Sequence, residues 1–334
     1  MSDPLSEIIT LLRPRAVFTK GISGAGRWGV RYTEFGHPGF CAVIEGSCRL
    51  AVDGQQPLVL EQGDFVLLPR TPGFTMCGFE EVVPQIIDPH QAANAQGEVR
   101  HGTRTGPPSV RLLGGYFLFD QDNAGLLTSL LPAQIHVRGV ARLAGLVQML
   151  TDEAARQQPG RELVLVRLVE ILLVEALRLG QTRDAAPGLL RGLSDPRLSE
   201  ALRQMHDHPA QGWTLEKLAR KVALSRSAFF ERFTRHVGVA PMEYLLGWRM
   251  AMAKNLLRGG GITTAEVAGR VGYGSASAFN TAFSRHVGQP PGRFARSALA
   301  AARESVFTSE EIASPGVIAI KAPESSSSKQ GMQA

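Results

Sequence analysis

The sequence has little cysteine and no long hydrophobic run. Three of its 334 residues are cysteine, an odd number without paired spacing, which argues against a disulfide framework and fits a reducing compartment. No run of about eighteen apolar residues is present to span a membrane. The start, Met1-Ser2-Asp3-Pro4, opens no cleavable signal pattern. These absences predict a soluble, cytoplasmic protein of two domains plus linkers, without a membrane partner.

A recognisable catalytic or metal-binding pattern is also missing. No Ser/His/Asp or Cys/His constellation stands at a familiar spacing, so we expect no enzyme and no cofactor. His37 stands alone in a turn-rich segment, and His206-x-His208 precedes a proline, which is more typical of a helix end than of a ligand pair. We therefore predict no metal site.

What the sequence does contain is an internal repeat with a period of fifty residues. The repeated residues are Phe229, Phe233, Arg235-His236-Val237-Gly238 and Pro241 in the first copy, and Phe279, Phe283, Arg285-His286-Val287-Gly288 and Pro291 in the second. Such a unit is a supersecondary module copied within one domain. Upstream, Ala219 and Val222 return after forty-nine residues as Ala268 and Val271, so the second copy has a turn one residue longer.

Each copy is predicted to be a helix-turn-helix. In the first, apolar residues from Leu215 to Val222 share one helical face behind an N-cap at Thr214, and Ser225 caps the next helix. In the second copy, the first helix is expected from Thr264 to Val271, and Ser275 is the expected N-cap of the second helix. Phenylalanines at i and i+4 face inward in both second helices. The outward positions are Arg226, Ser227, Phe230 and Glu231 in the first copy, and Ala276, Ser277, Asn280 and Thr281 in the second.

A single helix is predicted between the two copies, from Tyr244 to Leu257, ending before the run Arg258-Gly259-Gly260-Gly261. A stiff connector would fix the distance between the two outward-facing helices. Two such helices can enter successive major-groove segments about 34 Å apart on one face of DNA.

The charge distribution agrees with DNA binding. Residues 191–300 hold sixteen Lys and Arg against seven Asp and Glu, whereas the rest of the chain holds twenty against twenty-three. A localised positive excess is expected for phosphate contacts, although a basic helix face is often only a solvated surface.

Residues 213–296 resemble the DNA-binding domain of the AraC/XylS family of bacterial transcription regulators. The residues in register are Arg249 and Ala253 of the connector and Ile262, Glu266-Val267-Ala268, Val271-Gly272-Tyr273, Ser275-Ala276-Ser277-Ala278-Phe279, Phe283, Gly288-Gln289-Pro290-Pro291 and Phe294. The resemblance implies that the eight outward residues contact bases. Many members have Arg where this chain has Glu231, and Glu favours a cytosine amino group where Arg favours guanine.

Other roles stay open for individual residues of this set. Arg226 has the alternative of a phosphate contact, and Phe230 has either a thymine methyl contact or a core position. Arg235 and Arg285 come late in their helices, where phosphates or the helix C-terminal dipole suit them better than bases.

The N-terminal third is predicted to be β structure. Short β-rich runs over residues 28–35, 40–44, 48–52 and 65–68 are punctuated by turn signals, among them Glu45-Gly46. The segment from Cys41 to Pro69 and the run 110–119 resemble the cupin sensor domain of one AraC-family subgroup. Metal-binding cupins place histidines near the positions that Phe40, Cys41 and Phe74 occupy here, so the ligand set is absent. The expected fold class is α+β, with a cupin-like β-barrel, a helical linker pair and an all-α double helix-turn-helix domain.

The interior of this barrel has two candidate roles, thiol chemistry or a small-molecule pocket. Cys41 and Cys77 lie on segments expected to face the interior, and the resemblance extends to relatives that respond to oxidants or electrophiles through cysteines. The plain alternative is that each is a small buried hydrophobe. The aromatic residues that would line a pocket, or simply fill the core, are Trp28, Phe40, Phe65 and Phe74.

Two apolar helical segments are predicted over residues 140–150 and 162–177. They either form the interface of a homodimer or pack against the barrel of the same chain. The expected domains are 1–137 (cupin-like sensor), 138–188 (linker helices, with the linker itself at 181–188), 189–298 (double helix-turn-helix) and 299–334 (disordered tail). The protein is predicted to be a transcription regulator, and the resemblance implies that it is an activator. Its expected partners are double-stranded promoter DNA and RNA polymerase. A small molecule or an oxidant is the expected inducer. The alternatives are a cupin-type enzyme fused to a DNA-binding domain and a ligand-independent architectural DNA binder.

Overall fold

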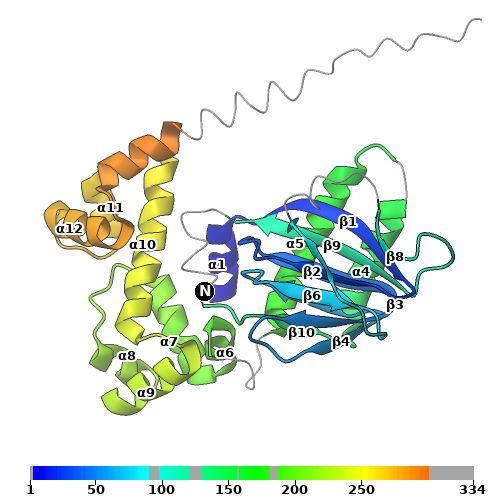
Figure 1. The fold of residues 1–334 in the computed structure, drawn as a ribbon. Coiled ribbons are helices and arrows are strands. Elements are labelled where there is room, and N and C mark those ends of the chain that lie inside the picture. Colours follow the sequence, from blue (N-terminus) through cyan, green and yellow to red (C-terminus); the bar gives the residue numbers. More distant parts are fainter. Residues whose placement is uncertain (1–2, 90–97, 120–129, 156–157, 181–186, 301–334) are drawn as a thin grey trace, which may run out of the picture.

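A computed structural model describes residues 3–89, 98–119, 130–155, 158–180 and 187–300. Residues 181–186 of the expected linker and residues 301–334 of the expected tail lie outside these ranges. Figure 1 shows a β domain on one side, a helical domain on the other, and the first helix, α1 (Pro4–Leu12), between them. The cupin-like β domain and the all-α C-terminal domain confirm the predicted fold class.

The β domain is built from strands that pair in the order β7-β2-β6-β3-β9-β1-β8, with β4 and β5 also on β3, and β10 on β5. The strands are β1 (Arg15–Ala25), β2 (Gly29–Tyr32), β3 (Gly39–Val52), β4 (Leu58–Glu61), β5 (Phe65–Leu68), β6 (Phe74–Cys77), β7 (Gln85–Ile87), β8 (Val99–Gly102), β9 (Val110–Leu118) and β10 (Ile135–Val137). The long strand β3 pairs first with β5 and β9 and then with β4 and β6, so it belongs to both faces of the barrel.

The predicted turn at Glu45-Gly46 is wrong, because β3 continues through it as a β-bulge. The register between β3 and β9 shifts between Val43 and Glu45, and Gly46 has φ +76°. A glycine in the left-handed region lets a strand bend without leaving the sheet, which is how a strand passes from one face of a barrel to the other. The bulge lies where β3 changes partners.

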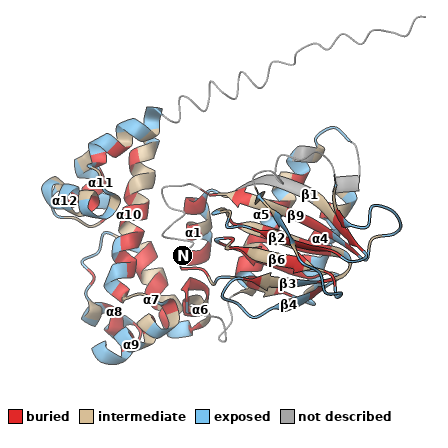
Figure 2. Ribbon diagram, in the orientation of Figure 1, coloured by how far each residue is buried: buried red, intermediate tan, exposed pale blue. Residues whose placement is uncertain are grey.

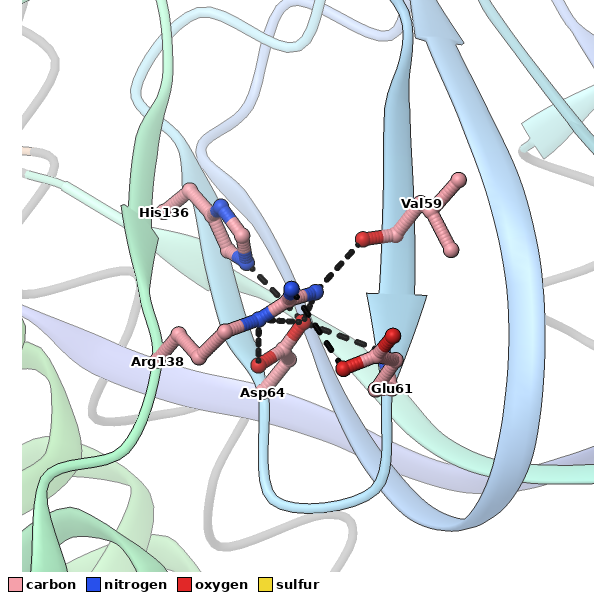
Figure 3. A network of polar contacts seen from close by, with 5 residues as sticks. All are labelled: Val59, Glu61, Asp64, His136 and Arg138. Carbon is pink, nitrogen blue, oxygen red and sulfur yellow. Dashed lines mark hydrogen bonds and ion pairs between the residues drawn. The ribbon is translucent and has the colours of Figure 1, made fainter.

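A polar network ties β10 to the turn before β5 (Figure 3). The Asp64 carboxylate, 1 % exposed, accepts bonds from Arg138 (Nη2, 2.6 Å), from the Glu61 N–H (3.0 Å) and from His136 (3.0 Å). Burial alone would raise the pKa of Asp64, but these hydrogen bonds hold it below its usual value. Arg138 also donates to the Val59 carbonyl at 2.7 Å, so one guanidinium joins β4, β5 and β10.

The remaining helices are α4 (Ala141–Ala155), α5 (Arg161–Leu179), α6 (Leu189–Ser194), α7 (Pro196–Asp207), α8 (Leu215–Lys221), α9 (Arg226–Val237), α10 (Pro241–Gly259), α11 (Thr264–Arg270) and α12 (Ala276–Val287). Helix α5 packs on α4 and against β1, β5 and β10, which is the intramolecular packing that the sequence left open. None of the described helices is long and apolar enough to cross a membrane.

One hydrophobic core runs from the barrel into the first helix-turn-helix. It includes Phe65 and Phe117 of the barrel, Leu12 of α1, and Phe229 and Phe233 of α9. The second helix-turn-helix has its own core, built around Phe279 and Phe283 with residues from the second half of α10. The first helix-turn-helix is therefore packed as a continuation of the β domain, and the second is attached through α10.

Candidate DNA interface and sensor cavity

Local capping positions both predicted outward-facing helices. Ser225 Oγ accepts the Ala228 N–H at 3.2 Å at the start of α9, and Ser275 Oγ accepts the Ala278 N–H at 3.2 Å at the start of α12. Residues 222–225 separate α8 from α9, whereas residues 271–275 separate α11 from α12. This confirms the longer second turn that the change of offset predicts.

Exposed residues, pale blue in Figure 2, lie along the outer sides of α9 and α12. Of the eight candidate base-contacting residues, Arg226, Ser227, Phe230, Glu231, Ser277, Asn280 and Thr281 are exposed, and Ala276 is half-buried. Phe230 is 43 % exposed, which places it outward rather than in the core. Arg235 and Arg285 are exposed in the last turns of the same two helices.

Two arginines of the first unit are engaged within the protein. Arg226 Nε lies 2.9 Å from Glu216 of α8 on the exposed surface. Arg232 Nε donates to Asp195 at 2.7 Å, and Asp195 also caps α7. Burial by itself would raise the pKa of Asp195, but the bonds from Arg232 and from the N–H groups of α7 bring it below its usual value. DNA would thus compete with Glu216 for Arg226, whereas Arg232 serves to hold α9 on α7.

Helix α10 is longer than predicted and separates the two outward-facing helices α9 and α12. It begins with Pro241 in its first turn and ends at Gly259, followed by the C-cap Gly260 with a φ of +65°. Figure 1 shows α12 beside one end of α10 and α9 at the other end. Arg249 in its middle donates to the carbonyls of Pro209 (2.9 Å) and Gln211 (2.8 Å). Arg249 therefore fixes α10 to the segment between α7 and α8, a role that the sequence did not show.

The helix α1 of the β domain contacts α7 and α10. His206 of α7, 3 % exposed, lies 2.9 Å from the Glu7 carboxylate through Nδ1 and 2.8 Å from the Tyr244 hydroxyl through Nε2. Its ring stacks on Trp248 with centroids 3.7 Å apart. Because a carboxylate only accepts, Nδ1 carries the proton and Tyr244 donates to Nε2. Burial lowers the pKa of His206, with Glu7 opposing it. His206 indeed lies near a helix end, as predicted, but it also joins the two domains.

A second bond joins the same two domains. At the end of α1, Arg13 donates to the Asn255 Oδ1 at 2.7 Å. A cavity of about 430 Å³ lies beside these contacts, lined by residues of α1 and α10. The pairing of α1 with α10 could not be read from the sequence, because nothing in the local pattern of residues 4–12 identifies their distant partners.

A largely apolar cavity of about 130 Å³ lies inside the barrel. Phe40 and Phe74 line it, whereas Trp28 and Phe65 are core residues. Cys41 lies in its wall, and burial raises the pKa of the Cys41 thiol. Cys77 is half-buried at the end of β6 and is not part of the lining. Among the described residues, no group of three or more His, Cys, Asp or Glu side chains is placed to hold a metal ion.

Known proteins share both halves of this architecture. A family profile described as Cupin matches residues 3–179, and one described as Helix-turn-helix domain matches residues 218–297. An AraC-like transcription regulator of Streptomyces lividans is 38 % identical over 87 % of this chain and 97 % of its own length. The RCS-specific HTH-type transcriptional activator RclR of Escherichia coli is 24 % identical over 87 % of this chain and 96 % of its own.

Among solved structures, the DNA-binding domain of the global transcriptional factor AdpA, in complex with a target DNA, is 31 % identical. The match covers 31 % of this chain and 92 % of the AdpA domain, with a TM-score of 0.30. The extent of the sequence matches, across the β domain and the double helix-turn-helix alike, identifies the chain as a DNA-binding transcription regulator of the AraC-like family.

Proposed function

We propose that this regulator activates transcription in the cytoplasm from promoters with two half-sites one helical turn apart, and that a signal received in the barrel controls it. The observation that carries the proposal is the pair of exposed helices α9 and α12 at the two ends of one helix, α10. Successive major-groove segments on one face of DNA lie about 34 Å apart, and two recognition helices held at that separation by a stiff helix would enter both. A family relative, RclR, is named an activator, which supports the direction of regulation.

In this proposal the eight outward residues of α9 and α12 read bases, and Arg235 and Arg285 contact phosphates. Exposure and position in the helix support these roles, because N-terminal residues of a recognition helix face base edges and late residues face the backbone. Glu231 would favour a cytosine at its position.

The signal passes to DNA through the contacts between the domains. The continuous core and the hydrogen bond that His206 donates to Glu7 link the barrel to the first helix-turn-helix. Any change in the barrel that favours one arrangement of these contacts shifts the population of domain arrangements, and with it the position of α9 relative to α12.

A small-molecule inducer is supported better than an oxidant. A reactive cysteine needs its thiolate, and burial disfavours the thiolate of Cys41. The apolar cavity beside Cys41 instead offers space for a ligand.

RNA polymerase and a second copy of the chain are the proposed protein partners. The dimer proposal rests on exposed apolar side chains on the outer face of α4 and α5, which are Met149, Leu163, Val164 and Ile171. In this proposal, activation acts through a contact with polymerase bound at the adjacent promoter.

The test is a binding selection on sheared host DNA with the purified full-length protein, followed by footprinting. We expect each footprint to contain two half-sites about one helical turn of DNA apart. Asn280→Ala should lose about 1–3 kcal/mol of discrimination at one half-site. Arg285→Ala should weaken binding to all DNA sequences. It should also reduce by about 1 the slope of the logarithm of the binding constant against the logarithm of the salt concentration. Arg104→Ala, on an exposed loop of the barrel, is the matched control.

Three outcomes would contradict the proposal or a part of it. Salt-dependent binding without sequence preference would favour the architectural DNA binder. Stoichiometric metal together with turnover of a substrate would favour a cupin-type enzyme. An oxidant-dependent footprint that is lost in Cys41→Ser or Cys77→Ser would replace the small molecule with a thiol signal.

A further inference from the structure

We infer that the barrel cavity takes an uncharged, mainly apolar molecule about the size of a one-ring aromatic compound, anchored by a hydrogen bond to the Tyr32 hydroxyl. The inference rests on the proposed function, since it names the chemical class of the inducer that the barrel would receive.

The size of the ligand follows from the volume of the cavity, about 130 Å³. An apolar protein cavity of about 150 Å³ lined by Leu, Ile and Phe is known to bind benzene. The cavity also owes its room to glycine in its wall. A β-carbon at Gly114 would lie 2.8 Å from Ile22 Cδ1, so a side chain at this position would press on the neighbouring wall.

The absence of charge in the lining selects an uncharged ligand. The wall is formed mainly by aliphatic and aromatic side chains, including Ile22, Phe40, Leu50, Val66, Phe74 and Met76. None of the described residues that line the cavity is Asp, Glu, Lys, Arg or His. A carboxylate or an ammonium group would lose its hydration there without gaining a counter-charge, which is strongly unfavourable.

Three side chains of the lining carry a hydroxyl, those of Tyr32, Thr71 and Tyr116, and Tyr32 is the proposed anchor. Thr71 Oγ1 already donates to the Leu68 carbonyl at 3.1 Å. Among the described residues, none hydrogen-bonds to the Tyr32 hydroxyl, and the Tyr32 ring is held by stacking on Phe74 with centroids 4.9 Å apart. Burial raises the pKa of Tyr32 to about 12, so the phenol stays protonated at neutral pH. It can therefore donate to, or accept from, one polar group of the ligand.

The experiment is titration calorimetry of the full chain with three probes of one shape: toluene, p-cresol and 4-methylbenzoate. We expect p-cresol to bind about threefold to tenfold more tightly than toluene, which is the usual contribution of one hydrogen bond. We expect 4-methylbenzoate to bind more than about a hundredfold more weakly than p-cresol, because its charge is buried without a partner.

Three variants locate the site. Tyr32→Phe should bring p-cresol to the affinity of toluene and leave toluene unchanged. Cys41→Leu fills part of the cavity and should weaken the binding of toluene and p-cresol, whereas Cys77→Leu, outside the lining, should leave the binding of both unchanged. Thermal unfolding of each variant shows whether it is folded. Because Tyr32→Phe removes a single oxygen atom, it keeps the test valid if Cys41→Leu does not fold.

The inference is overturned if no probe binds, if 4-methylbenzoate binds as tightly as p-cresol, or if Tyr32→Phe leaves the preference for p-cresol intact. The outcome is separable from that of the proposed function. Specific footprints without probe binding would reject only the ligand class. Probe binding without specific footprints would reject only the regulatory function and leave the cavity assignment standing.

Discussion

His206 Nδ1 lies 2.9 Å from a carboxylate oxygen of Glu7, a contact between residues 199 positions apart. It joins α1, the first helix of the chain, to α7 of the DNA-binding domain. The imidazole is buried and neutral, with Tyr244 donating to its other nitrogen at 2.8 Å. The interface between the domains therefore depends on the protonation state of one side chain.

Acidification should weaken this interface. Because burial lowers the pKa of His206 below the usual value near 6.5, the unfolded chain binds a proton more readily than the folded chain. The contribution of His206 is thus complete above pH 6.5 and is lost as the pH falls below it. His206→Gln should reduce the decline in the free energy of unfolding between pH 7.5 and 5.5, measured by urea denaturation. The exposed His208→Gln is the control, and an unchanged decline in His206→Gln would contradict the prediction.

Arg249 should set the spacing of the two recognition helices. Its guanidinium donates to two carbonyls, of Pro209 and Gln211, and a lysine cannot reproduce both bonds. Arg249→Lys should weaken binding to DNA with both half-sites by about tenfold, or about 1.4 kcal/mol. Binding to a single half-site should change little, as measured by fluorescence anisotropy. Arg270→Lys on the exposed surface of α11 is the control, and an equal loss on both DNAs would show that Arg249 acts elsewhere.

The Asp64 network should stabilise the barrel above acidic pH. Its hydrogen bonds hold the pKa of Asp64 below its usual value, so its contribution is present above about pH 4 and is lost as the pH falls further. Asp64→Asn should lower the free energy of unfolding at pH 7 by about 2–3 kcal/mol, and much less at pH 3.5. Asp53→Asn, which breaks the exposed pair with Arg31, should cost less than about 1 kcal/mol. Equal losses in the free energy of unfolding for Asp64→Asn and Asp53→Asn would show that the buried Asp64 network stabilises the barrel no more than an exposed ion pair does.

Gly46 should tolerate no side chain. An alanine there would keep a left-handed backbone and would also collide with the Ser109 carbonyl oxygen. We expect Gly46→Ala to destabilise the protein by more than about 3 kcal/mol, against about 1 kcal/mol for Gly54→Ala. Gly54 has a similar φ of +73° but open space around it, so the difference isolates the collision. Chemical denaturation of both variants checks this, and similar losses would mean that β3 can shift at the bulge.

The double helix-turn-helix was predictable because its signals are local. Caps such as Ser225 and Ser275 act within one helical turn, and the inward phenylalanines recur at i and i+4. The change of offset from fifty to forty-nine even gave the longer turn before α12. In the barrel, β-rich runs predicted β2, β3 and β5, whereas β1, β4, β6, β7, β8 and β10 were not predicted. Glu45-Gly46 was misread because a positive-φ glycine has the same local signature in a turn and in a bulge, and only the register with β9 distinguishes the two.

The sequence by itself determined the repeated DNA-binding unit, its caps and its exposed faces, since each depends on residues a few positions apart. The tertiary structure alone decided the rest. It brought Glu7 to His206 and Arg232 to Asp195, and it closed the barrel around an apolar cavity with Tyr32 in its wall. Contacts between residues far apart in the chain exist only once strand register and helix packing are set, and local periodicity does not encode them.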